Sequence, residues 1–146
     1  MIPLSQRDPR WSEIKLGTSD LTIGTHGCTI TALAMLFNTT PDVVNEKLKA
    51  VGGFSQESLV IWKKIEEAFP GSSINRVWAY DNENVAKNLP CLVEVDFDGT
   101  PKTNDKHWVV YKGNQELLDP WTGTIRPTSV YPPTGYTIVK IQAQSQ

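Results

Sequence analysis

Apolar residues in the first half of the chain recur with the period of a helix. After a loop that contains Gly24 and Gly27, apolar residues occupy positions i, i+3, i+4 and i+7: Ile30, Leu33, Ala34 and Phe37. Residues with this spacing share one face of an α-helix. The pattern predicts a helix from about Cys28 to Asn38, and this helix begins directly after the glycine loop.

A second predicted helix has signals at both ends. Thr40 suits an N-cap, Pro41 suits the first helical position, and Gly52 lies just past the end of the pattern. We expect its inner face to carry the apolar residues Val44, Leu48 and Val51.

A third helix is predicted from about Gln56 to Phe69. The dipeptide Pro70-Gly71 follows it and is a strong helix stop. We expect four residues of this helix to point inward: Leu59, Trp62, Ile65 and Phe69.

The second half of the chain is more typical of strands. In residues 91–97, CLVEVDF, the residues Cys91, Val93, Val95 and Phe97 alternate with more polar ones. Further strands are predicted at 73–80, 107–112, 115–119 and 136–141, with a short helix at 83–89. Helices first and strands later predict an α+β fold, with an antiparallel sheet packed against the first helix.

Composition and charge narrow the classes of function. The 146 residues suit one domain over 1–146, and the net charge of −2 gives no sign of a nucleic-acid or acidic-membrane partner. No apolar run approaches the ~18 residues that span a bilayer. The N-terminal stretch MIPLSQRDPRW lacks the pattern of a signal peptide. We therefore expect a cytoplasmic or phage-encoded protein, or a secreted chain that starts after its leader.

Cys28 lies where the glycine loop becomes a helix. Unpaired N–H groups and the helix dipole favour an anion there, so a thiol in this place has a lowered pKa and more thiolate. Gly27 would leave room for a substrate beside it. The alternative is a small buried structural cysteine, and the position alone does not separate the two.

A thiolate nucleophile needs a base, and the chain has two histidines. His26 lies in the same tight loop as Cys28, whereas His107 begins a predicted strand. A base normally reaches the nucleophile from another element across the cleft, so His107 is the better candidate. The alternative for His107 is a structural histidine at a sheet edge.

Asp119 is the candidate that would orient the base. A hairpin with the three-residue loop Lys112-Gly113-Asn114 would place His107 directly opposite Asp119 on one face. A two-residue Gly113-Asn114 loop would place them on opposite faces. The sequence permits both loops, and catalysis needs the two side chains on one face.

An acyl-transfer site also needs hydrogen-bond donors for the developing oxyanion. The backbone N–H of Cys28 is one by position, and the side-chain amide of Gln6 is a candidate for another. Trp108 and Trp121 flank the proposed triad as candidate cleft walls for the substrate, with packing in the core as the alternative for each.

Several segments, in this order, resemble the C39-like cysteine peptidases of the papain-like superfamily: SQRDPRW, KLG, TIGTHGCTITALAM, GGF, HWVV and DPWTG. The resemblance spans about residues 3 to 125. It implies a papain-like fold, with Cys28 as nucleophile, His107 as base, Asp119 as orienting acid and Gln6 as oxyanion residue. In papain the glutamine lies a few residues before the cysteine; here Thr22 occupies that nearer position.

The resemblance implies a hydrolase that cleaves a peptide or isopeptide bond through an acyl-enzyme. We expect a monomer without a cofactor or metal, acting on a peptide such as a leader peptide or a cell-wall peptide. The same triad also suits transfer of the acyl group to an amine, as in papain-like transglutaminases.

A binding module is the non-enzymatic alternative. Its groove would be lined by the loop YPPTGY and by the five tryptophans at positions 11, 62, 78, 108 and 121. A metal site is less favoured, because His26, Cys28, His107 and Asp119 lack paired short-spacing motifs. A Cys28–Cys91 disulfide would require an oxidising compartment, and Cys91 lies in a strand pattern typical of a core.

Overall fold

The computed structural model describes residues 1–77, 81–97 and 106–142. Its helices are α1 (Ile23–His26), α2 (Cys28–Phe37), α3 (Pro41–Ala50), α4 (Trp62–Ala68) and α5 (Asn82–Lys87), with a 3₁₀ turn η1 (Thr128–Val130). Its strands are β1 (Ser73–Val77), β2 (Cys91–Asp96), β3 (Lys106–Gly113), β4 (Glu116–Asp119), β5 (Thr124–Pro127) and β6 (Pro133–Gln142).

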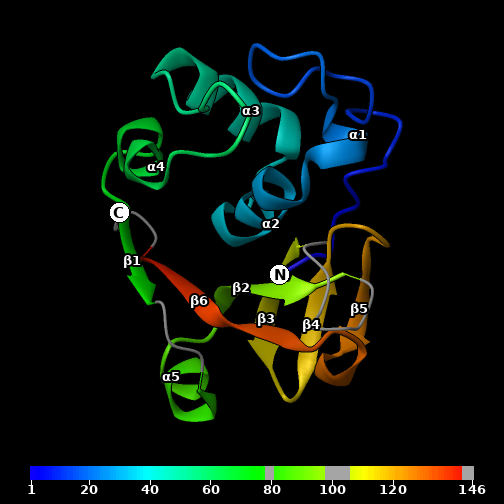
Figure 1. Ribbon diagram of the computed structural model, residues 1–146, viewed down its shortest axis with the longest axis vertical. Helices are drawn as coiled ribbons and strands as arrows, with labels where there is room; N and C mark the ends of the chain where they lie inside the picture. The colour runs from blue at the N-terminus through cyan, green and yellow to red at the C-terminus, as the bar shows by residue number, and fades with distance from the viewer. Residues whose placement is uncertain (78–80, 98–105, 143–146) are drawn as a thin grey trace.

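The strands form one six-stranded antiparallel sheet in the order β1-β6-β2-β3-β4-β5. Helices α1 to α4 lie on one side of it and α5 lies apart from them (Figure 1), with α2 packed closely against β3. The α+β class and the packing of the first long helix on the sheet are therefore confirmed.

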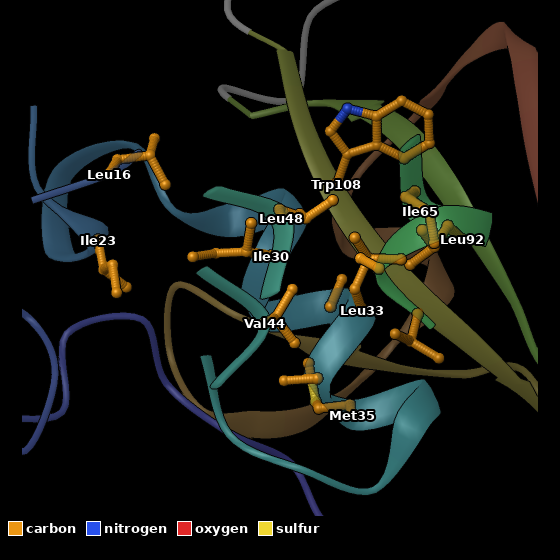
Figure 2. Packing of buried hydrophobic residues seen from close by; sticks show 14 of the residues in the cluster. Leu16, Ile23, Ile30, Leu33, Met35, Val44, Leu48, Ile65, Leu92 and Trp108 are labelled. Atoms are coloured by element: carbon orange, nitrogen blue, oxygen red, sulfur yellow. The ribbon is translucent and has the colours of Figure 1, made fainter. Parts of the chain in front are cut away.

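Helix α2 is buried along the face that its sequence predicts. Ile30, Leu33 and Ala34 are almost completely inaccessible, and Asn38 ends the helix in the left-handed conformation. In α3, Thr40 is the N-cap and Pro41 the first helical residue, as expected. Figure 2 shows the core between these helices and the sheet, with these residues labelled: Leu16, Ile23, Ile30, Leu33, Met35, Val44, Leu48, Ile65, Leu92 and Trp108.

The predicted third helix is wrong in its first half, because α4 begins only at Trp62. Before it, the Ser55 hydroxyl accepts hydrogen bonds from the backbone N–H of Glu57 and of Leu59, at 3.3 and 3.1 Å. Ser58 takes a left-handed conformation (φ 63°). These local bonds compete with a helix. As a result, Leu59 points outward and is 63% exposed.

Strand β2 is buried on both faces, although its sequence alternates. Leu92 joins the core on the helix side, whereas Cys91, Val93 and Val95 join a second cluster on the other side. That second cluster also contains Val85 from α5 and Tyr131. The strand at 73–80 is observed as β1 over Ser73–Val77, and residues 78–80 lie outside the described residues.

The β3–β4 hairpin uses neither predicted loop. Asn114 and Gln115 form its turn, both with positive φ (57° and 59°), and Gly113 pairs with Glu116. A register shift between Tyr111 and Gly113 adds one residue to β3. Because Val110 pairs with Leu118, Asp119 falls across from Val109 rather than from His107. His107 and Val109 share a face of the strand, so Asp119 still lies on the side of His107.

Candidate active site

Cys28 is the first residue of α2 and lies against the short helix α1. The junction between these helices depends on Gly27, since a Cβ there would come within 2.5 Å of the Ile23 carbonyl oxygen. Gly27 is buried, and Cys28, half-buried, reaches the cleft. The tight junction therefore places a thiol among the unpaired N–H groups at the start of α2.

His107 and Asp119 meet at the end of the sheet. His107 Nε2 donates to Asp119 Oδ1 at 2.8 Å, and both side chains are buried. A carboxylate can only accept here, so Nε2 carries a proton and Nδ1 is left for the hydrogen bond that joins His107 to Cys28. The structure therefore joins His107 to Asp119 by a hydrogen bond, and the interaction of His107 with the Cys28 thiol shifts the pKa of both groups.

Two further groups act on the Cys28 thiol. The backbone N–H of Trp108 and the hydroxyl of Thr29 both help to lower its pKa. Trp108 follows His107 in β3, so this strand supplies both the imidazole and a backbone donor. Hydrogen bonds of this kind favour the charged thiolate over the neutral thiol.

The electrostatics follow from these contacts. Burial raises the pKa of the Cys28 thiol, but the hydrogen bond and the charge of His107 outweigh it, so the pKa is lowered. For His107, burial lowers the pKa, and the hydrogen bonds with Asp119 and Cys28 reverse this and raise the pKa to about 9. Burial likewise opposes ionisation of Asp119, yet the hydrogen bond from His107 helps to lower its pKa to about 2. The two shifts therefore act in the same sense: the pairing favours the Cys28 thiolate and the His107 imidazolium.

Cys28 and His107 line a cleft of about 500 Å³. On the sheet side it is lined by Glu94, Phe97, Lys106, His107, Trp108 and Trp121; on the helix side and in the loops by Gln6, Leu16, Leu21, Thr25, His26, Cys28, Thr29, Ile30, Glu57, Ser58, Leu59 and Val60. The volume and the mixture of apolar walls with a few polar groups are typical of a small-molecule or peptide site.

Gln6 lies at the cleft and is almost completely buried, at 2% exposed. Its backbone N–H donates to the Pro120 carbonyl oxygen at 2.7 Å, and its Nε2 donates to the Gly24 carbonyl oxygen at 3.2 Å. One Nε2 hydrogen is left for another acceptor. Thr22, in contrast, uses its hydroxyl within the capping box of α1.

The tryptophans divide between core and cleft. Trp11 is buried, and Trp62 packs on Trp108 with ring centroids 5.1 Å apart. Trp108 is only 7% exposed although it lines the cleft, so it packs in the core as well. Trp121 forms a more open wall and stacks beneath the Arg7 guanidinium. Trp78 and part of YPPTGY lie outside what can be described at the level of side chains.

Three residues of the site were missed by the sequence analysis. The Tyr131 hydroxyl donates to Asp119 Oδ2 at 2.6 Å, and Arg126 Nη1 donates to the same oxygen at 3.2 Å. Phe97 stacks on the His107 ring at a centroid distance of 4.6 Å. Arg126 lies on β5, a strand of four residues that carries too weak a pattern to predict. Tyr131 lies in YPPTGY, whose sequence predicts a loop that lines a binding groove and carries no signal of a contact with Asp119.

The chain matches none of the protein-family models and none of the curated proteins with which it was compared. Within the described residues, no helix is long and apolar enough to cross a membrane, and no cluster of His, Cys, Asp and Glu suits a metal ion. Cys28 and Cys91 are not joined by a disulfide bond.

Proposed function

We propose that this protein is a cysteine peptidase or amidase that hydrolyses a peptide or isopeptide bond. The observation that carries the proposal is that Cys28 and His107 line the same cleft, while His107 is hydrogen-bonded to the buried Asp119 behind it. The lowered pKa of Cys28 favours the thiolate nucleophile, and the raised pKa of His107 favours the imidazolium that acts as the acid.

In the proposed reaction, the Cys28 thiolate attacks the carbonyl carbon and pushes an electron pair onto the oxygen. The backbone N–H of Cys28 and the remaining Nε2 hydrogen of Gln6 are the candidate donors for that oxyanion. His107 gives its proton to the leaving nitrogen as the C–N bond breaks, and the thioester remains. His107, now neutral, then removes a proton from water, whose oxygen attacks the thioester carbon and displaces the Cys28 thiolate; the thiolate–imidazolium pair is restored and the acid product leaves.

The papain-like fold and the C39-like family are part of the same proposal. A cysteine at the start of a helix, a histidine on a facing antiparallel strand and the ordered sequence segments all support it. By that resemblance the substrate is a peptide, such as a leader peptide with a double glycine or a cell-wall cross-bridge peptide.

The first test is an activity screen against double-glycine leader peptides and peptidoglycan cross-bridge peptides. We expect cleavage by the wild-type protein and none by Cys28→Ala, with Cys91→Ala as the matched control that keeps activity. Adding a primary amine separates hydrolysis from acyl transfer, because transfer would yield the amide product. Equal cleavage by Cys28→Ala would rule out the proposed nucleophile.

A second test needs no substrate. Limited alkylation with iodoacetamide at neutral pH, read by mass spectrometry, should label Cys28 first. Cys91 is completely buried in β2, whereas Cys28 is half-buried and hydrogen-bonded to His107. Preferential labelling of Cys91 would contradict the assignment of the reactive thiol.

A further inference from the structure

Asp119 is held by more groups than the triad requires. Its Oδ1 accepts from His107 Nε2 at 2.8 Å and from the backbone N–H of Trp121 at 2.9 Å. Its Oδ2 accepts from the Tyr131 hydroxyl at 2.6 Å and from Arg126 Nη1 at 3.2 Å. A carboxylate has about four acceptor sites, and all of them are therefore used. Such a set fixes both the orientation and the ionised state of the carboxylate.

The hydroxyl of Tyr131 is itself oriented. Arg126 Nη1 donates to it at 3.0 Å, and a guanidinium has no acceptor, so the hydroxyl proton has to point to Asp119. Tyr131 is 5% exposed, while the Arg126 side chain is 34% exposed. Burial and the hydrogen bond to Asp119 raise the pKa of Tyr131, so it stays a donor over the whole neutral range.

Tyr131 also contacts the catalytic imidazole. Its ring meets the His107 ring edge-on at a centroid distance of 5.6 Å, and Phe97 stacks on His107 at 4.6 Å. The two aromatic rings restrict the imidazole, while the hydroxyl holds the carboxylate behind it. Replacing Tyr131 with phenylalanine would keep the ring contact and remove only the hydrogen bond.

We propose that Tyr131, oriented by Arg126, is a positioning residue that holds Asp119 ionised and aligned, and thereby maintains the imidazolium of His107 beside the Cys28 thiolate. The effect of this positioning role on turnover rests on the proposed function. Its consequence for the thiolate can be measured without any substrate.

The direction of the effect follows from the hydrogen bond. Without the Tyr131 donor, the ionised form of Asp119 is less stable and its pKa rises. A carboxylate that is held less firmly also aligns less well with His107 Nε2, so it stabilises the imidazolium less and the thiolate loses part of its counter-ion's support. Cys28 then takes up a proton at higher pH. The loss of one hydrogen bond to a charged group changes the pKa of that group by about one unit, and we expect a shift of similar size at Cys28.

The experiment compares Tyr131→Phe with Tyr111→Phe and the wild-type protein. The rate of Cys28 alkylation is measured across the acid range, and kcat and KM are measured on a cleaved peptide. We expect the acid-side midpoint of Tyr131→Phe to rise by about one pH unit and its kcat to fall about tenfold with little change in KM. Tyr111 is the matched control, because it is also 5% exposed in the same cluster but lies toward the hairpin turn.

Superimposable alkylation profiles for Tyr131→Phe and the wild-type protein would overturn the inference, as would an equal shift in Tyr111→Phe. Arg126→Gln is the second variant should Tyr131→Phe fail to fold, since the half-buried Arg126 side chain tolerates change more readily. It should shift the midpoint in the same direction, whereas Arg126→Lys should restore most of the wild-type profile. An unchanged midpoint in Arg126→Gln would then contradict the inference.

The two proposals fail in different ways. A wild-type protein that cleaves no peptide, yet whose Cys28 midpoint moves in Tyr131→Phe, contradicts the hydrolase and supports the positioning role. A wild-type protein that cleaves peptides, with the same midpoint in both proteins, supports the hydrolase and contradicts the positioning role.

Discussion

His26 and His107 both line the cleft around Cys28, but their surroundings differ in every respect that matters for a base. His26 is the exposed last residue of α1, and its Nδ1 contacts only the neighbouring Thr25 hydroxyl, at 2.8 Å, among the interactions that the structure gives. His107 is 1% exposed and bound to Asp119, and Phe97 stacks on its ring.

The difference shows what separates a nearby histidine from a usable one. A proton shuttle needs a ring held in one orientation, with its far nitrogen bound so that the near nitrogen faces the nucleophile. Only the imidazole on β3 meets these conditions among the described residues. For the choice of the base, a position on the sheet that fixes the imidazole ring therefore matters more than closeness to Cys28 in the sequence.

The largest expected effect comes from removing the supported histidine. His107→Ala should lower kcat/KM by at least ~10³-fold and slow alkylation of Cys28 near neutral pH, because the thiolate loses its counter-ion and the leaving group loses its acid. Peptide cleavage and alkylation rates are the measurements. If His26→Ala abolished cleavage while His107→Ala retained it, the assignment of His107 as the base would be wrong.

Next in size is the effect of Gln6, which is bonded to α1 through the Gly24 carbonyl oxygen. Gln6→Ala should lower kcat by ~10²–10³-fold with little change in KM, because an oxyanion donor acts in the transition state. Steady-state kinetics on one cleaved peptide would measure it. Near-normal turnover would leave the backbone N–H of Cys28 as the main donor to the oxyanion.

Asp119→Ala should have a smaller effect, a loss of about 10–10²-fold in kcat. The carboxylate orients the His107 ring and does not touch the substrate, so some correctly oriented rings remain. The residual rate is measured against the same peptide. A loss as complete as that of His107→Ala would mean that the imidazole cannot act at all without the carboxylate.

The smallest expected effect is that of His26→Ala, and the pH dependence of hydrolysis tests it against His107. His107 has a pKa raised to about 9, so its imidazolium persists below that pH and is lost as the pH rises through it. Hydrolysis should therefore hold up to about pH 9 and then decline. His26→Ala should keep this profile and most of the activity. If His26→Ala lost the alkaline decline, the decline could not be due to His107, and the comparison would be contradicted.

Local patterns predicted the helix that carries Cys28, because Ile30, Leu33 and Ala34 mark its buried face without reference to distant residues. They also predicted the strand that begins near His107. The start of α4 was missed, since Ser55 and Ser58 favour a turn that apolar periodicity does not reveal.

The hairpin shows how far register can be inferred. The sequence permits two loops for β3–β4, Lys112-Gly113-Asn114 and Gly113-Asn114. The observed turn is neither of them: it consists of Asn114 and Gln115 and has a bulge before it. The bulge adds a residue, and the side of the sheet on which Asp119 falls depends on that count. The contacts of Tyr131 and Arg126 with Asp119 could not be predicted from the sequence for another reason. They join an edge strand and a loop whose positions depend on the whole sheet.

The N-terminal segment is attached to the turn between β4 and β5, and this has a consequence for when the site forms. Gln6 donates to Pro120, Arg7 donates to the Trp121 carbonyl oxygen 114 residues away, and a Cβ at Gly123 would meet Ser5 at 2.7 Å. Closing so long a loop is entropically expensive and is favourable only when the elements between are in place. A chain still emerging during synthesis can form α2 and α3 before β4 exists. We therefore expect the completed cleft, with Gln6 beside Cys28, to be among the last features that the chain acquires as it folds.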